Sequence, residues 1–66
     1  MKLAEELTNI LVTEQISVTQ LAARLNVSSA MVSMVISGDA KPGLKFMRGL
    51  WKHYRKLCKE YLEEKI

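Results

Sequence analysis

The residues best suited to nucleophilic chemistry are Cys58 and His53, each the only one of its kind in the chain. Five residues of helix separate their directions by about 140°, so they cannot form a nucleophile–base pair. One cysteine and one histidine are also too few to ligate a structural metal. The carboxylates of Glu5 and Glu6 suit a solvated helix start, and no glycine-rich phosphate loop occurs. We therefore expect no enzyme activity, metal, cofactor or small-molecule substrate.

Basic side chains are concentrated in the C-terminal part of the chain. Residues 1–40 carry two basic and four acidic residues, a net charge of −2, whereas residues 41–66 carry eight and three, a net charge of +5. Such a block suits nucleic acid or an anionic membrane surface, although a solvated helix face has the same composition. No leader segment and no apolar run of roughly 18 residues occurs. We expect a cytoplasmic protein with no membrane partner.

The periodicity of apolar residues predicts helices throughout, in a single domain spanning residues 1–66. A first helix is expected over roughly 2–14. Ser17 and Gln20 then form an S-x-x-Q capping box that starts a second helix. Asn26 can adopt the left-handed conformation that ends this helix.

Two further helices are expected after that stop. Ser28 is a suitable N-cap for a third helix, roughly 29–36, and Gly38 suits its end. A heptad repeat then predicts one long amphipathic helix over about 43–64, in which Gly49 marks a kink or a split into two. The residues of this helix expected to close the core are Leu44, Met47, Leu50 and Trp51.

The second and third helices are joined by a turn of only three residues. The small side chain of Ala22 lets the two helices cross closely, and Val27 and Val32 can hold the third helix from below. Two helices at a steep angle leave one of them protruding. A protruding helix fits the major groove of DNA, which is about 12 Å wide.

Several of these elements occur in a shared register: Leu21-Ala22, Leu25, Val27-Ser28, Val32-Ser33, Gly38 and Lys41-Pro42. Through them the segment of residues 16–50 resembles the helix-turn-helix (XRE-type) domain of the phage lambda repressor and Cro proteins. The resemblance implies a compact all-α domain of four to five helices that binds double-stranded DNA. The helix beginning at Ser28 would be the recognition helix. Its implied base contacts come from Ser29, Ala30, Ser33 and Met34.

The resemblance also implies phosphate contacts from Ser28, at the helix start, and from Ser37 and Lys41. In the family, the start of the fourth helix lies near the recognition helix, so we hypothesise that Lys41, Lys45 and Arg48 grip the DNA backbone. These residues belong to a basic stripe on one flank of the long helix. Its other members are Lys52, Arg55, Lys56 and Lys59.

The chain departs from the family where contacts with DNA are expected. Val18 replaces the family's usual phosphate-binding Gln, and Gln20 could substitute only in a rotated or shifted helix. The segment from Val27 to Gly38 contains no Arg, Lys, Asn or Gln, the residues that make bidentate contacts to bases. Specificity must then rest on DNA shape and deformability, or the helix serves another purpose.

The C-terminal half of the long helix extends beyond what the core requires. Its apolar side could pack on the first helix through Leu3 and Leu7, or form a dimer seam with a second copy. We expect a homodimer, because the family binds paired half-sites about 34 Å apart with two-fold symmetry. The seam would consist of Tyr54, Leu57, Cys58, Tyr61 and Leu62.

The function expected from these features is sequence-specific DNA binding at an inverted repeat, as a nucleoid-associated transcriptional repressor of phage, mobile-element or bacterial type. Two alternatives remain. One is a helical adaptor that contacts another protein through Met31 and Met34, and the other is a peripheral membrane peptide built on the basic helix. Salt-dependent binding of DNA distinguishes the DNA-binding repressor from the adaptor.

Overall fold

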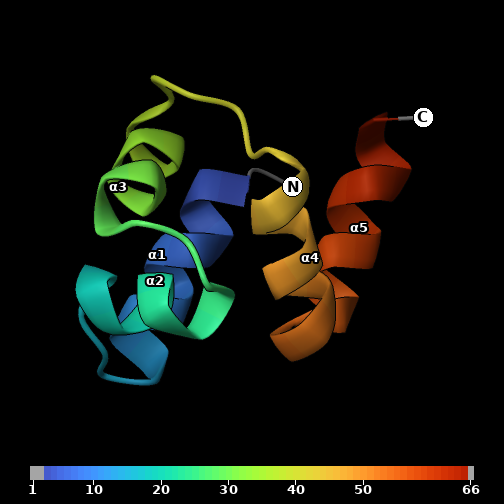
Figure 1. Cartoon of the computed structure of the whole chain (residues 1–66). Coiled ribbons are helices and arrows are strands. Elements are labelled where there is room, and N and C mark those ends of the chain that lie inside the picture. Colours follow the sequence, from blue (N-terminus) through green and yellow to red (C-terminus); the bar gives the residue numbers. More distant parts are fainter. Residues whose placement is uncertain (1–2, 66) are drawn as a thin grey trace.

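The computed structural model describes residues 3–65, and within them the chain forms five α-helices and no strand (Figure 1). The predicted all-α class with four to five helices is confirmed. The first helix was expected from residue 2, which lies outside the described residues. The helices are α1 (Leu3–Thr13), α2 (Val18–Leu25), α3 (Ser29–Ser37), α4 (Leu44–His53) and α5 (Arg55–Lys65).

The capping residues start and end α2 as expected. The Ser17 hydroxyl accepts a hydrogen bond from the Gln20 N–H at 3.1 Å, and the Gln20 side-chain oxygen accepts one from the Ser17 N–H at 2.8 Å. This reciprocal pair satisfies two backbone donors that the helix leaves without partners. Asn26, with φ 60° and ψ 43°, ends α2 in the left-handed conformation.

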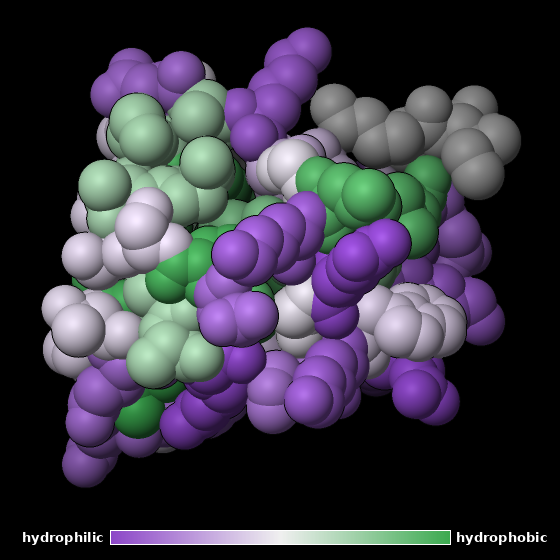
Figure 2. Space-filling model, viewed as in Figure 1, coloured by the Kyte–Doolittle hydropathy of each residue, from purple (hydrophilic) through white to green (hydrophobic). Residues whose placement is uncertain are grey.

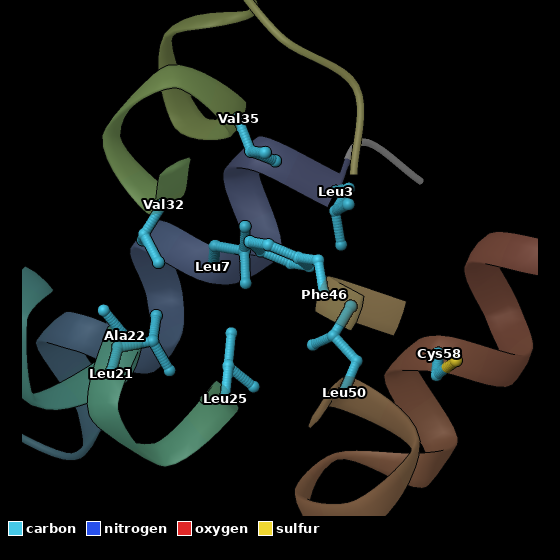
Figure 3. Packing of buried hydrophobic residues seen from close by; sticks show 10 residues of the cluster. All are labelled: Leu3, Leu7, Leu21, Ala22, Leu25, Val32, Val35, Phe46, Leu50 and Cys58. Atoms are coloured by element: carbon cyan, nitrogen blue, oxygen red, sulfur yellow. The ribbon is translucent and has the colours of Figure 1, made fainter. Parts of the chain in front are cut away.

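One buried apolar core contains residues from all five helices. α3 packs on α1 and α2, α4 packs on α2, and α5 packs on α4. Figure 3 shows Leu7 and Phe46 in the middle of this core, with Cys58 set apart on α5. The buried residues are Leu3, Leu7, Leu21, Ala22, Leu25, Val32, Val35, Phe46, Leu50 and Cys58.

The prediction of one long helix over residues 43–64 is wrong. The chain breaks at Tyr54, where φ is −136° and ψ is 57°, and the segment forms α4 and α5 as two packed helices. Gly49, expected to mark the kink or split, lies inside α4 instead. A Cβ on Gly49 would lie 2.3 Å from the backbone oxygen of Leu25, so its role is to let α4 approach α2.

The register of α4 also differs from the heptad expectation. Leu50 is fully buried as predicted, but Phe46 replaces Leu44 and Trp51 in the core. Leu44 is 70% exposed and Trp51 is 47% exposed. Phe46 and Leu50 are four residues apart and lie on one face of a straight α-helix. The a and d positions of the heptad had instead placed Leu44 and Trp51 on the core side.

The five helices form a body of 30 × 22 × 21 Å. The longest of them, α1 and α5, have 11 residues each. At 1.5 Å per residue they extend about 16 Å, roughly half the hydrocarbon thickness of a bilayer. No helix in residues 3–65 therefore has the length and apolar character to cross a membrane.

Candidate nucleic-acid interface

α3 presents an uncharged face to solvent. Its opposite side is held in the core by Val32 and Val35. At 100° per residue, the exposed side chains fall within about 140° of the helix circumference. They include the four residues predicted to contact bases, Ser29, Ala30, Ser33 and Met34, and the fifth is Ser37 in the last turn. The structure therefore brings this predicted set onto one surface.

The turn that positions α3 consists of Asn26, Val27 and Ser28. The Val27 N–H donates to the Ala22 carbonyl at 3.0 Å, which ties the turn back to α2. The Ser28 hydroxyl then accepts a hydrogen bond from the Met31 N–H at 3.1 Å and caps α3. At the other end, Gly38 closes the helix with φ 87°. Local hydrogen bonds thus fix where α3 starts and the direction in which it leaves α2.

A basic hollow lies beside this pair of helices, between the C-terminal end of α2 and the outer flank of α4. Its volume is about 790 Å³, and no acidic residue lines it. Figure 2 shows hydrophilic side chains gathered over the middle of this face of the molecule. The charged and titratable residues of the lining are Arg24, Lys45, Arg48, Lys52 and His53. A surface of this sign and shape suits a phosphate backbone.

A second, smaller hollow lies at the start of α3 and shares the lining residue Lys45 with the basic one. It has a volume of about 200 Å³ and is lined in part by Ser28, Met31 and Phe46. Lys45 lines both hollows, so the cations of α4 continue to the N-terminus of α3. A ligand that contacts the first turn of α3 would therefore meet the basic hollow directly.

Three of the six residues predicted to contact phosphate come together around these hollows. Ser28 and Lys45 line the smaller hollow, and Lys45 and Arg48 line the larger one. Lys41 is exposed on the segment between α3 and α4. These four side chains are open to an anionic ligand.

The remaining two predicted phosphate ligands already have partners within the chain. The side-chain oxygen of Gln20 accepts the capping hydrogen bond from Ser17, which leaves only its NH₂ group for a phosphate. The Ser37 hydroxyl lies 3.1 Å from the Met34 carbonyl and donates to the Asp39 carboxylate at 2.9 Å. That carboxylate would repel a phosphate, so Ser37 is poorly suited to the predicted role.

Arg24 on α2 contacts two residues that lie just outside helices, one after α1 and one between α4 and α5, at the edge of the basic hollow. Its guanidinium forms an ion pair with Glu14 and donates to the Tyr54 hydroxyl at 2.6 Å, and this hydroxyl lies 3.3 Å from the Glu14 carboxylate. The hydrogen bonds with Tyr54 and Glu14 raise the pKa of Arg24 above its already high value. Because Glu14 offsets this charge, the cations open to a ligand in the hollow are chiefly those of α4.

Sequence reasoning did not anticipate that Arg24, Lys52 and His53 share one hollow with Lys45 and Arg48. For the α4 cations a signal was present, because positions 45, 48 and 52 follow the i, i+3, i+7 spacing of one helix flank. Arg24 lines the hollow from α2, and its position beside the α4 cations depends on how closely α2 and α4 pack.

The residues predicted to form a dimer seam are largely occupied within the chain. Cys58 is 2% exposed, and Tyr54, Leu57 and Tyr61 are half-buried against the core. Leu62, which is 45% exposed, is the exposed member of this set. The homodimer stays a prediction, but this set of residues does not form its open surface.

Cys58 and His53 are not brought together as a catalytic pair. Cys58 is buried with its Sγ 3.8 Å from the Met47 carbonyl, whereas His53 lines the basic hollow. Burial raises the pKa of the Cys58 thiol and so keeps it in its less reactive, protonated form. Within residues 3–65, no cluster of His, Cys, Asp or Glu has the arrangement to hold a metal ion.

The interface therefore consists of an uncharged helix face bordered by a basic hollow. Comparison with known proteins finds no matching family model, no matching curated protein and no matching solved structure.

Proposed function

We propose that this protein binds double-stranded DNA, with α3 in the major groove and the α4 cations on the adjacent phosphate backbone, and that it regulates transcription. α2, the short turn and α3 act together as a helix-turn-helix. Bound at a promoter, a domain of this size acts by occluding the site.

The observation that carries the proposal is the continuity of the two surfaces through Lys45. This residue lines the hollow next to Ser28 as well as the basic hollow. A duplex that receives α3 in its major groove therefore presents a phosphate strand to Lys45, Arg48 and Lys52. Phosphate contacts fix the register of a protein on DNA, and groove contacts supply its specificity.

Specificity in this proposal depends on the shape of the groove more than on bidentate hydrogen bonds. The exposed residues of α3 that are predicted to contact bases are two serines, an alanine and a methionine. Serine hydroxyls bond to several bases, while Ala30 and Met34 can contact thymine methyl groups. Sequences that deform easily or contain thymine at these positions should be preferred.

Pairing of two copies on an inverted repeat remains part of the proposal as a prediction. Within the predicted seam, Tyr54, Leu57 and Tyr61 are half-buried in the monomer, and Leu62 is its exposed member. Sedimentation of the protein alone and on a selected duplex measures the number of copies bound.

The adaptor alternative has less support. It requires Met31 and Met34 together on an open surface, and Met34 is 40% exposed. Met31 is half-buried and packs against the core. The uncharged face of α3 remains the one observation in favour of this alternative.

The proposal is tested by selecting bound duplexes from a randomised library at about 150 mM salt, where non-specific binding is weak. Enrichment of related sequences is expected. Affinity for the selected duplex is then measured with Ser33→Asp, which places a carboxylate on the exposed face of α3. Like charges in contact cost several kcal/mol, so affinity should fall by about 100-fold or more.

Asn9→Asp is the matched control, because it adds the same charge at an exposed position of α1. It should leave affinity within about threefold, since screening weakens distant charges. Equal losses in both variants would mean that α3 does not face the DNA. Absence of any DNA binding at low salt would remove the proposal and favour the adaptor.

A further inference from the structure

α4 carries a second apolar face, of which only Met47 packs against the core. Phe46, Gly49 and Leu50 face the core, whereas Leu44, Met47 and Trp51 follow the i, i+3, i+7 spacing on the other side of the helix. Leu44 is 70% exposed and Trp51 is 47% exposed. Solvent exposure of a contiguous apolar strip on so small a domain indicates a contact surface.

α5 completes this strip into a groove. The hollow between the two helices has a volume of about 250 Å³ (Figure 2 shows a hydrophobic patch over α4 and α5). Leu62 on α5 is 45% exposed and forms the far wall, and the buried Cys58 lies at the floor. The residues that line it are Leu44, Met47, Arg48, Trp51, Cys58 and Leu62.

Cations border the groove on both walls. Arg48 lines it from α4, and the Arg55 guanidinium lies 4.9 Å from the centre of the Trp51 ring. Lys59 is exposed one turn after Arg55 on the same side of α5. Glu63 points about 100° away from Leu62 around α5 and lies one turn after Lys59, so it offsets part of the Lys59 charge and leaves Arg48 and Arg55 as the main cations of the groove.

We propose that this groove binds an acidic amphipathic helix of another protein. The apolar side of such a helix fills the groove with residues at i, i+3, i+4 and i+7, and its acidic flanks meet Arg48 and Arg55. The unbranched Met47 side chain at the groove wall can adjust to different partners. This proposal does not depend on the binding of DNA.

Charge favours this occupant over a second copy of the chain. A two-fold contact through the groove would bring the same residues of both copies together. Arg48 and Arg55 would then face their own counterparts across a partly desolvated interface. Like charges so placed oppose association, whereas acidic flanks favour it.

Trp51 gives a direct measurement, because it is the only tryptophan in the chain and lies in the groove. The probe is a synthetic amphipathic helix with leucines at i, i+3, i+4 and i+7 and glutamate or alanine elsewhere. Its control keeps the leucines and replaces each glutamate with lysine. The acidic peptide should shift Trp51 emission to shorter wavelength and saturate, and the basic peptide should not.

Two exposed positions test the groove itself. Leu44→Ala combined with Leu62→Ala should weaken the acidic peptide by at least about tenfold, or 1.4 kcal/mol. Val12→Ala, at a 72% exposed position on α1, should leave its affinity unchanged. Far-UV circular dichroism should be the same for all three proteins, because none of the three positions is in the core.

Three results would overturn the proposal. The first is no saturable emission shift up to about 1 mM peptide, where even weak groove binding would be visible. The second is an equal response to acidic and basic peptides. The third is a concentration-dependent doubling of mass that Leu44→Ala with Leu62→Ala abolishes, which would assign the groove to a second copy.

Discussion

Gly49 sets the distance between α2 and α4. A Cβ at this position would lie 2.3 Å from the Leu25 backbone oxygen and 2.8 Å from its Cα. Real Cβ atoms do not approach backbone atoms so closely, and no change of rotamer relieves the contact. The basic hollow depends on this approach, because α2 and α4 form its two walls.

Gly49→Ala should therefore destabilise the protein although alanine is the better helix former. Overpacking against backbone costs about 1–3 kcal/mol, which lowers the Tm of a domain this small by about 4 °C or more. Thermal unfolding followed by circular dichroism measures the change. Gly43→Ala is the control, because a Cβ there meets nothing within 4 Å; it loses only the preference for glycine at the N-cap of α4, so its Tm should fall less than that of Gly49→Ala. Equal Tm values for the two variants would mean that α4 can move away from α2.

At the scale of the elements, the boundaries of α2 and α3 were predictable from sequence because their signals are local. Ser17, Gln20 and Asn26 act on backbone groups within a few residues of themselves. The break at Tyr54 has no such local signal. Its hydroxyl is bound by Arg24 and Glu14, which are 30 and 40 residues away in the chain.

The difference between local signals and long-range contacts also explains which parts of the candidate site could be predicted. The exposed face of α3 follows from helical periodicity once the buried Val32 and Val35 are recognised. The heptad repeat assigned the wrong residues of α4 to the core. It placed Leu44 and Trp51 there and omitted Phe46. The basic hollow and the apolar groove both follow from the true register of α4, so neither could be derived before the packing of α4 on α2 was known.

Ser28 caps α3 and is also a proposed phosphate contact, and two substitutions separate these two roles. Ser28→Ala removes the acceptor for the Met31 N–H and should lower the free energy of unfolding by about 1 kcal/mol. Ser28→Asp retains a capping oxygen, so its stability should stay near that of the unmodified protein. Its charge opposes a phosphate, so it should lose more DNA affinity than Ser28→Ala. Urea unfolding and fluorescence anisotropy provide the two measurements, and the reverse order of affinities would argue against a phosphate at Ser28.

For the whole molecule, the segregation of charge decides how binding responds to salt. Residues 41–66 carry a net charge of +5, and the lining of the basic hollow includes no acid. If four phosphates are neutralised, the logarithm of the DNA association constant should fall against the logarithm of salt concentration with a slope of about −3.6. Lys52→Gln should reduce the slope by about 0.9. Lys56→Gln, which removes the same charge from an exposed position of α5 outside the hollow lining, should not. A slope near zero would exclude backbone contacts.

Arg48 lines both the basic hollow and the apolar groove. A carboxylate that pairs with this guanidinium in the groove withdraws it from a phosphate in the hollow, so the two ligands are antagonists. Thermodynamic linkage requires the effect to be reciprocal, with each ligand weakening the other by the same factor. The DNA affinity measured without and with saturating acidic peptide gives that factor, and Arg48→Gln should bring it close to one. An acidic partner would in this way release the protein from DNA without touching α3.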